Sequence, residues 1–252
     1  MRKIRPKRTS AKRFVVYCEG ETELNYVNGL KAWVQTMDDS IHIRIDSVCV
    51  GGGGYKKMLE KLRTEPDSNC IARLVMLDYD RCLSDVAERE AFRQLMQLSK
   101  STADRSRRVP IILVVSNRDF EYALCCHDPK YGDGNTDTFL RVEWGYKDVS
   151  KCKADKKVWD KAHMAARSHE VAIEHISCRP KLVENLIKTD VKALKVVLKE
   201  VDLHVANEHA VTSNLGDLFA VLLMKDVRGS RWGSVGSSGN PHRLNRGQSF
   251  GI

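Results

Sequence analysis

Acidic residues follow three separate apolar stretches of the chain, and carboxylates in such positions could bind a divalent metal ion. They are Glu19 and Glu23 after residues 14–18, Asp78 and Asp80 after residues 74–77, and Glu121 shortly after residues 111–115. Oxygen ligands without histidine or cysteine among them favour Mg²⁺ or Mn²⁺. These ions serve phosphoryl and phosphodiester chemistry, because they polarise the phosphate and activate the attacking water. The residue types therefore favour a metal site for phosphate chemistry.

Four apolar stretches alternate with helical patterns, which predicts an α/β fold with a central parallel sheet covered by helices on both faces. The expected strands are residues 14–18, 41–50, 74–77 and 111–115. In the second strand, isoleucines alternate with polar residues. One face of this strand is therefore expected to be exposed to solvent, which places the strand at a sheet edge. Right-handed crossovers then predict the strand order 2-1-3-4 in chain numbering. In this order all the acidic groups lie at the carboxyl edge of the sheet, where open α/β sheets bind ligands.

The expected order makes the first and third strands neighbours, so we expect Glu19 to face Asp78 and Asp80. If Asp78 and Asp80 continue the strand in an extended conformation, both side chains point to one side and can converge on a cation. Several carboxylates in a partly dry cleft need protons or a cation to neutralise them. The alternative is structural, because acidic residues after strands often cap helices, and Glu21 and Glu23 suit the start of a helix. Three such groups at one edge favour the metal site.

Composition divides the chain into four parts. We expect a basic flexible arm at residues 1–12, an α/β domain at 13–150, a helical appendage at 151–226 and a disordered tail rich in glycine, serine and arginine at 227–252. Within the appendage, apolar residues at helical spacing predict helices at residues 154–176, 181–201 and 215–223. In the second of these the stripe consists of Val183, Ile187, Leu194, Leu198 and Val201.

The charge balance of the chain indicates its partners. Lysine and arginine (42) exceed aspartate and glutamate (33), which gives the 252 residues a formal net charge of +9. Such a surplus makes a polyanion, nucleic acid first of all, the expected partner. No run of about 18 apolar residues is present, so we expect no membrane span. The N-terminal charges are not followed by the apolar stretch of a secretory signal, so we expect a cytoplasmic, reduced protein. The eight cysteines form no Cys-x-x-Cys pair, so we expect no structural zinc.

The acidic residues lie in three short motifs. These are Cys18-Glu19-Gly20-Glu21-Thr22-Glu23, Leu77-Asp78-Tyr79-Asp80 and Ser116-Asn117-Arg118-Asp119-Phe120-Glu121. Together they resemble the RloB family, which belongs to the Toprim superfamily with the OLD nucleases, and the resemblance covers residues 13–128. It implies a Toprim fold with a divalent metal, in which Glu19 is a metal ligand or general acid/base and Asp78 and Asp80 are metal ligands. It also implies that Glu23 supports a second metal ion and that Glu121 belongs to the catalytic group.

Members of the RloB family look like bacterial anti-phage or restriction-linked proteins, often encoded beside an ABC-type ATPase. The resemblance therefore implies nuclease action on DNA or RNA, tRNA included, with an ATPase as partner protein. The sequence leaves a homo-oligomeric assembly open.

The third motif departs from the family pattern, which has proline after Ser-Asn and tryptophan two residues after the glutamate. This chain has Arg118 and Ala123 there, and Arg118 could contact a phosphate. Lys56 and Lys57 follow four glycines and could help to hold a phosphate at a helix start, although a flexible turn is the alternative. The histidines at 163, 169 and 175 recur every six residues, which spreads them around a helix, and we expect them to be solvated.

Two functions follow from these patterns. The first is a metal-dependent nuclease in which Glu19 positions or deprotonates water and Asp78 and Asp80 hold the metal. The second, motivated by the altered third motif, is a binding or regulatory subunit whose turnover needs an ATPase partner or never occurs. A scaffold that binds nucleic acid only through its basic ends is a third class.

Overall fold

The computed structural model describes residues 12–36, 43–65, 70–104, 108–117 and 119–224. Three parts of the sequence prediction lie outside these described residues: the expected tail at 227–252, Arg118, and the expected arm apart from Lys12. Lys12 itself begins the first strand, although the sequence predicts it as the last residue of the arm.

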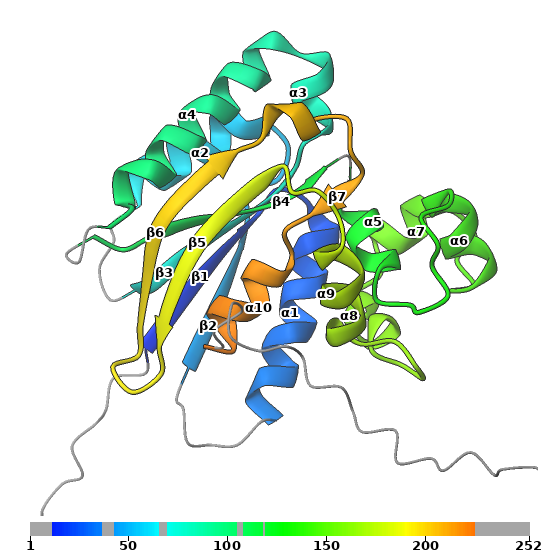
Figure 1. The fold of residues 1–252 in the computed structure, drawn as a ribbon. Coiled ribbons are helices and arrows are strands. Elements are labelled where there is room, and N and C mark those ends of the chain that lie inside the picture. The colour runs from blue at the N-terminus through cyan, green and yellow to red at the C-terminus, as the bar shows by residue number, and fades with distance from the viewer. Residues whose placement is uncertain (1–11, 37–42, 66–69, 105–107, 118, 225–252) are drawn as a thin grey trace, which may run out of the picture.

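The sheet at the centre of the molecule has five strands (Figure 1). They are β1 (Lys12–Cys18), β2 (Ile43–Cys49), β3 (Cys70–Asp78), β4 (Ile111–Asn117) and β7 (Thr212–Ser213). Their order is β2-β1-β3-β4-β7, and the first four run parallel. The order 2-1-3-4 is thus as expected for these strands, with β2 at an edge. The sequence did not indicate β7, a two-residue strand that pairs antiparallel with the end of β4.

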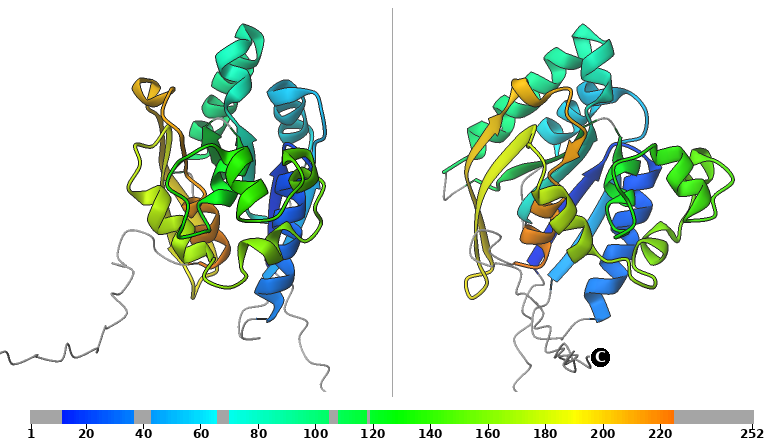
Figure 2. Two further views of the ribbon diagram at one scale, coloured as in Figure 1. Left: turned by 90° about the vertical axis from the view of Figure 1, so that its right-hand side faces the viewer. Right: turned by 45° about the vertical axis from the view of Figure 1, so that its right-hand side comes forward.

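Helices cover one face of the sheet and pack on its alternate side chains, among them Phe14, Val16, Leu74 and Val114. The longest is α1 (Glu21–Thr36), which contacts α8 (Val158–Ala162). The others in this region are α5 (Phe120–Cys125), α6 (Thr136–Val142), α7 (Val149–Lys153), α9 (His169–Ser177) and α10 (Gly216–Leu222). Figure 2 shows this arrangement from two further sides.

The opposite face packs through Val15, Val75 and Leu113 against two helices and a separate hairpin. The helices are α2 (Gly54–Thr64) and α4 (Val86–Thr102), and the hairpin consists of β5 (Val183–Asp190) and β6 (Lys195–Leu203). Two short helices, α3 (Asp80–Ser84) and η1 (Val205–Asn207), complete the chain. Because both faces are covered, β4 and most of β3 are buried, whereas the edge strand β2 is mostly half-buried; this arrangement confirms the α/β fold class.

The hairpin corrects one prediction, since the sequence indicated a helix at residues 181–201. Val183 and Asn185 are buried on β5, as are Val196 and Leu198 on β6, so the side chains alternate as strands require. The spacing of three between buried Leu198 and Val201 coincides with an irregularity in the register of the hairpin, and this is why the stripe also matches helical spacing. Residues 151–224 are therefore a mixture of helices and strands rather than a helical appendage.

In the part of the chain that the structure describes, no helix has both the length and the apolar character needed to cross a bilayer.

Candidate functional site

The ends of β1 and β3 bring Glu19 and Asp78 together. Cys18 lies opposite Met76 in the parallel register, and the backbone amide of Glu19 donates to the Met76 carbonyl at 3.2 Å. The chain then turns, and the backbone amide of Asp78 donates to Oε2 of Glu19 at 3.2 Å. The expected meeting of these two acids at the carboxyl edge is therefore present in the structure.

Two further glutamates reach the same edge from helices. Glu23, in the first turn of α1, is 4 % exposed and accepts a hydrogen bond from the backbone amide of Gly20 at 3.2 Å. Glu121, in the first turn of α5, is 2 % exposed and accepts a hydrogen bond from the Thr22 hydroxyl at 3.2 Å. This hydrogen bond connects the first turn of α1 to the first turn of α5. We refer to Glu19, Glu23, Asp78 and Glu121 as the carboxylate cluster.

The members of the carboxylate cluster disturb one another's ionisation. Burial raises the pKa of Glu23 to about 7, and the charges of Glu121 and Glu19 add to the effect. Burial likewise raises the pKa of Asp78 well above its usual range, with further contributions from Glu23, Glu121 and Glu19. Burial also raises the pKa values of Glu19 and Glu121. Four mostly buried carboxyl groups this close together cannot all be ionised unless a positive charge compensates their mutual repulsion.

Two basic side chains supply part of that charge. Arg81 Nε lies 3.0 Å from Oε1 of Glu19, and Lys153 Nζ lies 3.3 Å from Oε2 of Glu121. Partial burial is the largest single influence on the pKa of Lys153, and it lowers this pKa. The nearby negative charges together outweigh burial, so the pKa of Lys153 is raised; they belong to Glu121, Asp78 and Asp119. Sequence reasoning did not identify either cation. Arg81 directly follows the second motif and could have been suspected, whereas Lys153 comes from α7 and has no local signal.

Asp78 holds the least satisfied oxygen of the cluster. Its Oδ1 atom is shielded from solvent and has no hydrogen-bond partner within the described structure. Its backbone carbonyl, by contrast, accepts the Tyr55 hydroxyl. A buried carboxylate oxygen without a partner is costly unless a proton or a cation meets it.

The carboxylate cluster fits a hard divalent cation by the chemistry of its donors, because it offers only oxygen atoms and excess negative charge. Among the described residues, however, no three acidic, histidine or cysteine side chains are arranged to hold a metal ion. Glu19 and Glu121 face Arg81 and Lys153 instead. Coordination by these glutamates therefore requires the basic side chains to turn away, which their partial exposure permits.

Asp80 lies at the rim of the site and not within the cluster. The strand ends at Asp78, Tyr79 has helical backbone angles, and Asp80 opens α3, where its Oδ1 accepts the backbone amide of Arg81 at 2.7 Å. The extended Asp-x-Asp geometry that the sequence predicts is therefore wrong, because the chain turns into a helix at this point. Asp80 is exposed, and its charge is a minor influence on Glu19.

Lys56 and Lys57 do not reach the carboxylate cluster by any hydrogen bond or ion pair in the described structure. Lys57 Nζ donates to the carbonyls of Gly51 and Gly52, at 2.8 and 3.2 Å. Gly51 to Gly54 all have positive φ, so this turn requires glycine. The backbone amide of Tyr55 at the start of α2 donates to Glu88 at 2.7 Å, so a carboxylate already occupies the position expected for a phosphate. Lys56 is exposed and borders a groove between α2 and α4.

No protein-family model, curated protein or solved structure matches the chain. The resemblance to the RloB family thus depends on the three sequence motifs alone, and membership of that family stays a prediction.

Proposed function

We propose that the protein is a metal-dependent nuclease that hydrolyses phosphodiester bonds of nucleic acid at the carboxylate cluster. The observation that carries this proposal is the convergence of four mostly buried carboxylates on one sheet edge, with an unpartnered oxygen on Asp78. The net charge of +9 supports a polyanionic substrate. The setting in bacterial anti-phage defence, with an ABC-type ATPase as partner, has only the family resemblance behind it.

Each residue of the site has a role in this proposal. Asp78, Glu121 and Glu23 would hold Mg²⁺ or Mn²⁺, which when bound polarises a phosphate and makes water more acidic. Glu19, at the more open side of the cluster, would take the proton of the attacking water, because its raised pKa brings it closer to neutral pH. Arg81 and Lys153, released from their carboxylates, would contact phosphate oxygens. Asp80 would approach the site only from the rim.

Cleavage of tRNA, plasmid DNA and single-stranded oligonucleotides in Mg²⁺ or Mn²⁺ tests the proposal. We expect cleavage that EDTA removes and that Asp78→Asn lowers about 100-fold or more. Asp160→Asn, a substitution of an exposed acid on α8, is the matched control and should cleave as the wild type does. Circular dichroism and the melting temperature establish that the Asp78 variant is folded. Unchanged cleavage by folded Asp78→Asn would contradict the proposal.

A second function is favoured by the ion pairs of Arg81 and Lys153, which occupy two of the carboxylates. In this proposal the protein is a nucleic-acid- or nucleotide-binding subunit whose turnover requires an ATPase partner. Binding of nucleic acid without cleavage by the isolated protein, followed by cleavage when the ATPase is added, would distinguish it from the first.

The cytoplasm is the compartment that we propose for either function. All eight cysteines have free thiols, which suits a reducing environment.

A further inference from the structure

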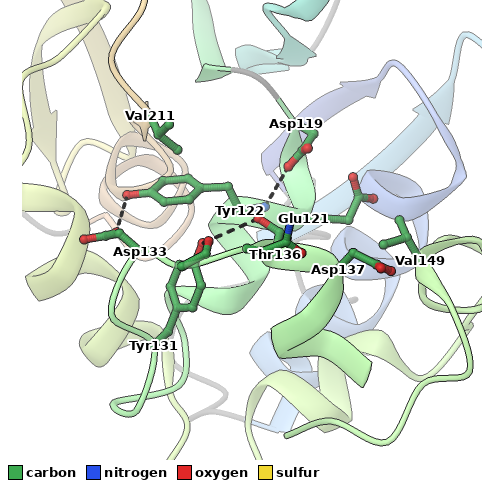
Figure 3. A pocket seen from close by; sticks show the side chains of 11 residues that line it. Asp119, Glu121, Tyr122, Tyr131, Asp133, Thr136, Asp137, Val149 and Val211 are labelled. Carbon is green, nitrogen blue, oxygen red and sulfur yellow. Dashed lines mark hydrogen bonds between the residues drawn. The ribbon is translucent and has the colours of Figure 1, made fainter. Parts of the chain in front are cut away.

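A cavity of about 340 Å³ lies beside the carboxylate cluster and shares Glu121 with it (Figure 3). Its volume is in the range of pockets that bind small organic ligands. The loop before α6, the starts of α5, α6 and α7, and the residue before β7 form its walls. The lining residues are Asp119, Glu121, Tyr122, Tyr131, Asp133, Gly134, Asn135, Thr136, Asp137, Val149 and Val211.

Two tyrosine rings give this cavity a rigid wall. Tyr122 and Tyr131 are 1 % and 4 % exposed, and their ring centroids are 6.0 Å apart. The Tyr131 hydroxyl donates to the Gly134 carbonyl at 3.0 Å, and the Tyr122 hydroxyl donates to Asp133 at 3.4 Å. Because both hydroxyls are held, the rings stay in place without a ligand. The Tyr131 ring is also stacked on His175 at 5.8 Å between centroids, so the cavity has a preformed shape that suits a rigid, flat ligand.

The polar groups of the cavity are mainly hydrogen-bond acceptors. Four carboxylates line it, of which Asp133 is neutralised by an ion pair with Arg179 and a contact to His175 at 2.9 Å. Asp137 pairs loosely with Arg141 at 3.9 Å and keeps 46 % of its side-chain surface accessible. A phosphate would be repelled from these carboxylates, whereas a neutral group that donates hydrogen bonds would be favoured.

We infer that this cavity binds a nucleobase of the substrate that carries an exocyclic amino group. The inference depends on the proposed nuclease function, because Glu121 then contributes to both the phosphate site and the base site. Guanine, adenine and cytosine each present an amino group, whereas uracil and thymine present mainly acceptors and would face the carboxylates unfavourably. A base reaches such a pocket when it is unpaired or turned out of a stack.

Filling the cavity tests the inference. Val211→Phe adds a ring at the cavity wall, and Val205→Phe adds the same ring at a site that is 56 % exposed and does not line the cavity. Asp137→Asn removes an acceptor, with Asp160→Asn as its control. The ligands are guanosine, adenosine, cytidine and uridine without phosphate, and their binding to the full chain is followed by NMR in the absence of metal. Cleavage of oligonucleotides that differ in a single base is measured in parallel.

We expect at least one amino-bearing nucleoside to bind about fivefold or more tightly than uridine, and Val211→Phe to weaken it about tenfold. Asp137→Asn should reduce the preference over uridine, while both controls behave as the wild type. Equal binding of all four nucleosides, or wild-type binding by both test variants, would overturn the inference. If Val211→Phe does not fold, Asp137→Asn decides, since its side chain is largely at the surface.

Nucleoside binding needs neither metal nor cleavage, so the two proposals can fail separately. Selective nucleoside binding without any metal-dependent cleavage would refute the nuclease and leave a base-binding site. Metal-dependent cleavage with no base preference and no effect of Val211→Phe would leave the nuclease and refute the base pocket.

Discussion

The backbone amide of Asp78 donates a hydrogen bond to Oε2 of Glu19 at 3.2 Å, which joins two residues 59 positions apart in the sequence. The other oxygen of Glu19 is 3.0 Å from Arg81 Nε. Glu19 is thus held at the edge of the sheet by one bond from the backbone and one from a cation. Only the second of these can be removed by substitution without disturbing the strand end.

Arg81→Gln should therefore separate metal binding from cleavage. Because the guanidinium places a positive charge beside the carboxylate cluster, the variant should bind Mn²⁺ several-fold more tightly. Its kcat/KM for nucleic acid should fall about tenfold, since a contact to the phosphate is lost. Arg93→Gln is the control, because within the described residues the ion pair of Arg93 is with exposed Glu90. Unchanged Mn²⁺ affinity in Arg81→Gln would contradict an effect of the Arg81 charge on the metal site.

Lys153→Met should destabilise the protein because it leaves Glu121 buried without its cation. We expect the free energy of unfolding at pH 8 to fall by about 1 to 2 kcal/mol, as measured by urea denaturation. The loss should become smaller as the pH falls, since burial already raises the pKa of Glu121, removal of Lys153 raises it further, and protonation removes the unpaired charge.

The double variant Lys153→Met/Glu121→Gln provides the control for this pair. It removes both charges and should regain most of the lost stability. A double variant as unstable as Lys153→Met alone would mean that the lysine acts through packing and not through Glu121.

Gly29→Ala should destabilise the protein although alanine favours helices. On helix propensity alone, the change within α1 would stabilise by about 1 kcal/mol. A β-carbon at this position would lie 2.1 Å from Cβ of Trp159, however, so α1 and α8 would have to separate. We expect a net loss of about 2 kcal/mol in thermal or chemical denaturation. Gly132→Ala, where a β-carbon meets nothing within 4 Å, should be close to neutral.

Asp217 should make stability depend on pH below neutrality. It accepts hydrogen bonds from the side-chain amides of Asn185 and Asn214, at 2.8 and 2.9 Å, yet burial raises its pKa to about 6. The folded state therefore holds the proton more tightly than the unfolded chain. As the pH rises from about 4 to about 6, the contribution of this group to the free energy of unfolding should fall by about 2 kcal/mol.

Asp217→Asn tests this dependence, because asparagine does not titrate and can still accept from both amides. The difference between wild type and variant, followed by urea denaturation from pH 4 to pH 8, should change mainly between pH 4 and pH 6. A difference that stays constant over this range would contradict the pKa assigned to Asp217.

The sequence was informative where apolar runs and acidic residues follow one another directly. The alternating pattern of β2 indicated an edge strand, and an edge position for β2 predicted the order of the parallel strands. This order makes β1 and β3 neighbours, which predicted the contact between Glu19 and Asp78. These inferences succeeded because each depends on local patterns and on the handedness of crossovers.

The sequence was misleading where a contact from a remote segment decides the structure. The turn of the β5–β6 hairpin lacks glycine, proline and asparagine and ends in Leu194 with φ of 46°, so no turn signal interrupts the apparent helix. His169 was expected to be solvated but is 4 % exposed, because its ring packs against Trp33 of α1 at 5.0 Å between centroids. Lys153 was missed for the same reason, since its partner Glu121 lies in another helix.

Binding of Mn²⁺, followed by electron paramagnetic resonance, tests most directly whether the carboxylate cluster shares a hard cation. Wild-type protein should bind at least one Mn²⁺, and Asp78→Asn should weaken that binding about tenfold or more, while Asp160→Asn leaves it unchanged. If the wild type binds no Mn²⁺, or if folded Asp78→Asn binds it equally well, the cluster is not a metal site and the proposed nuclease mechanism is wrong.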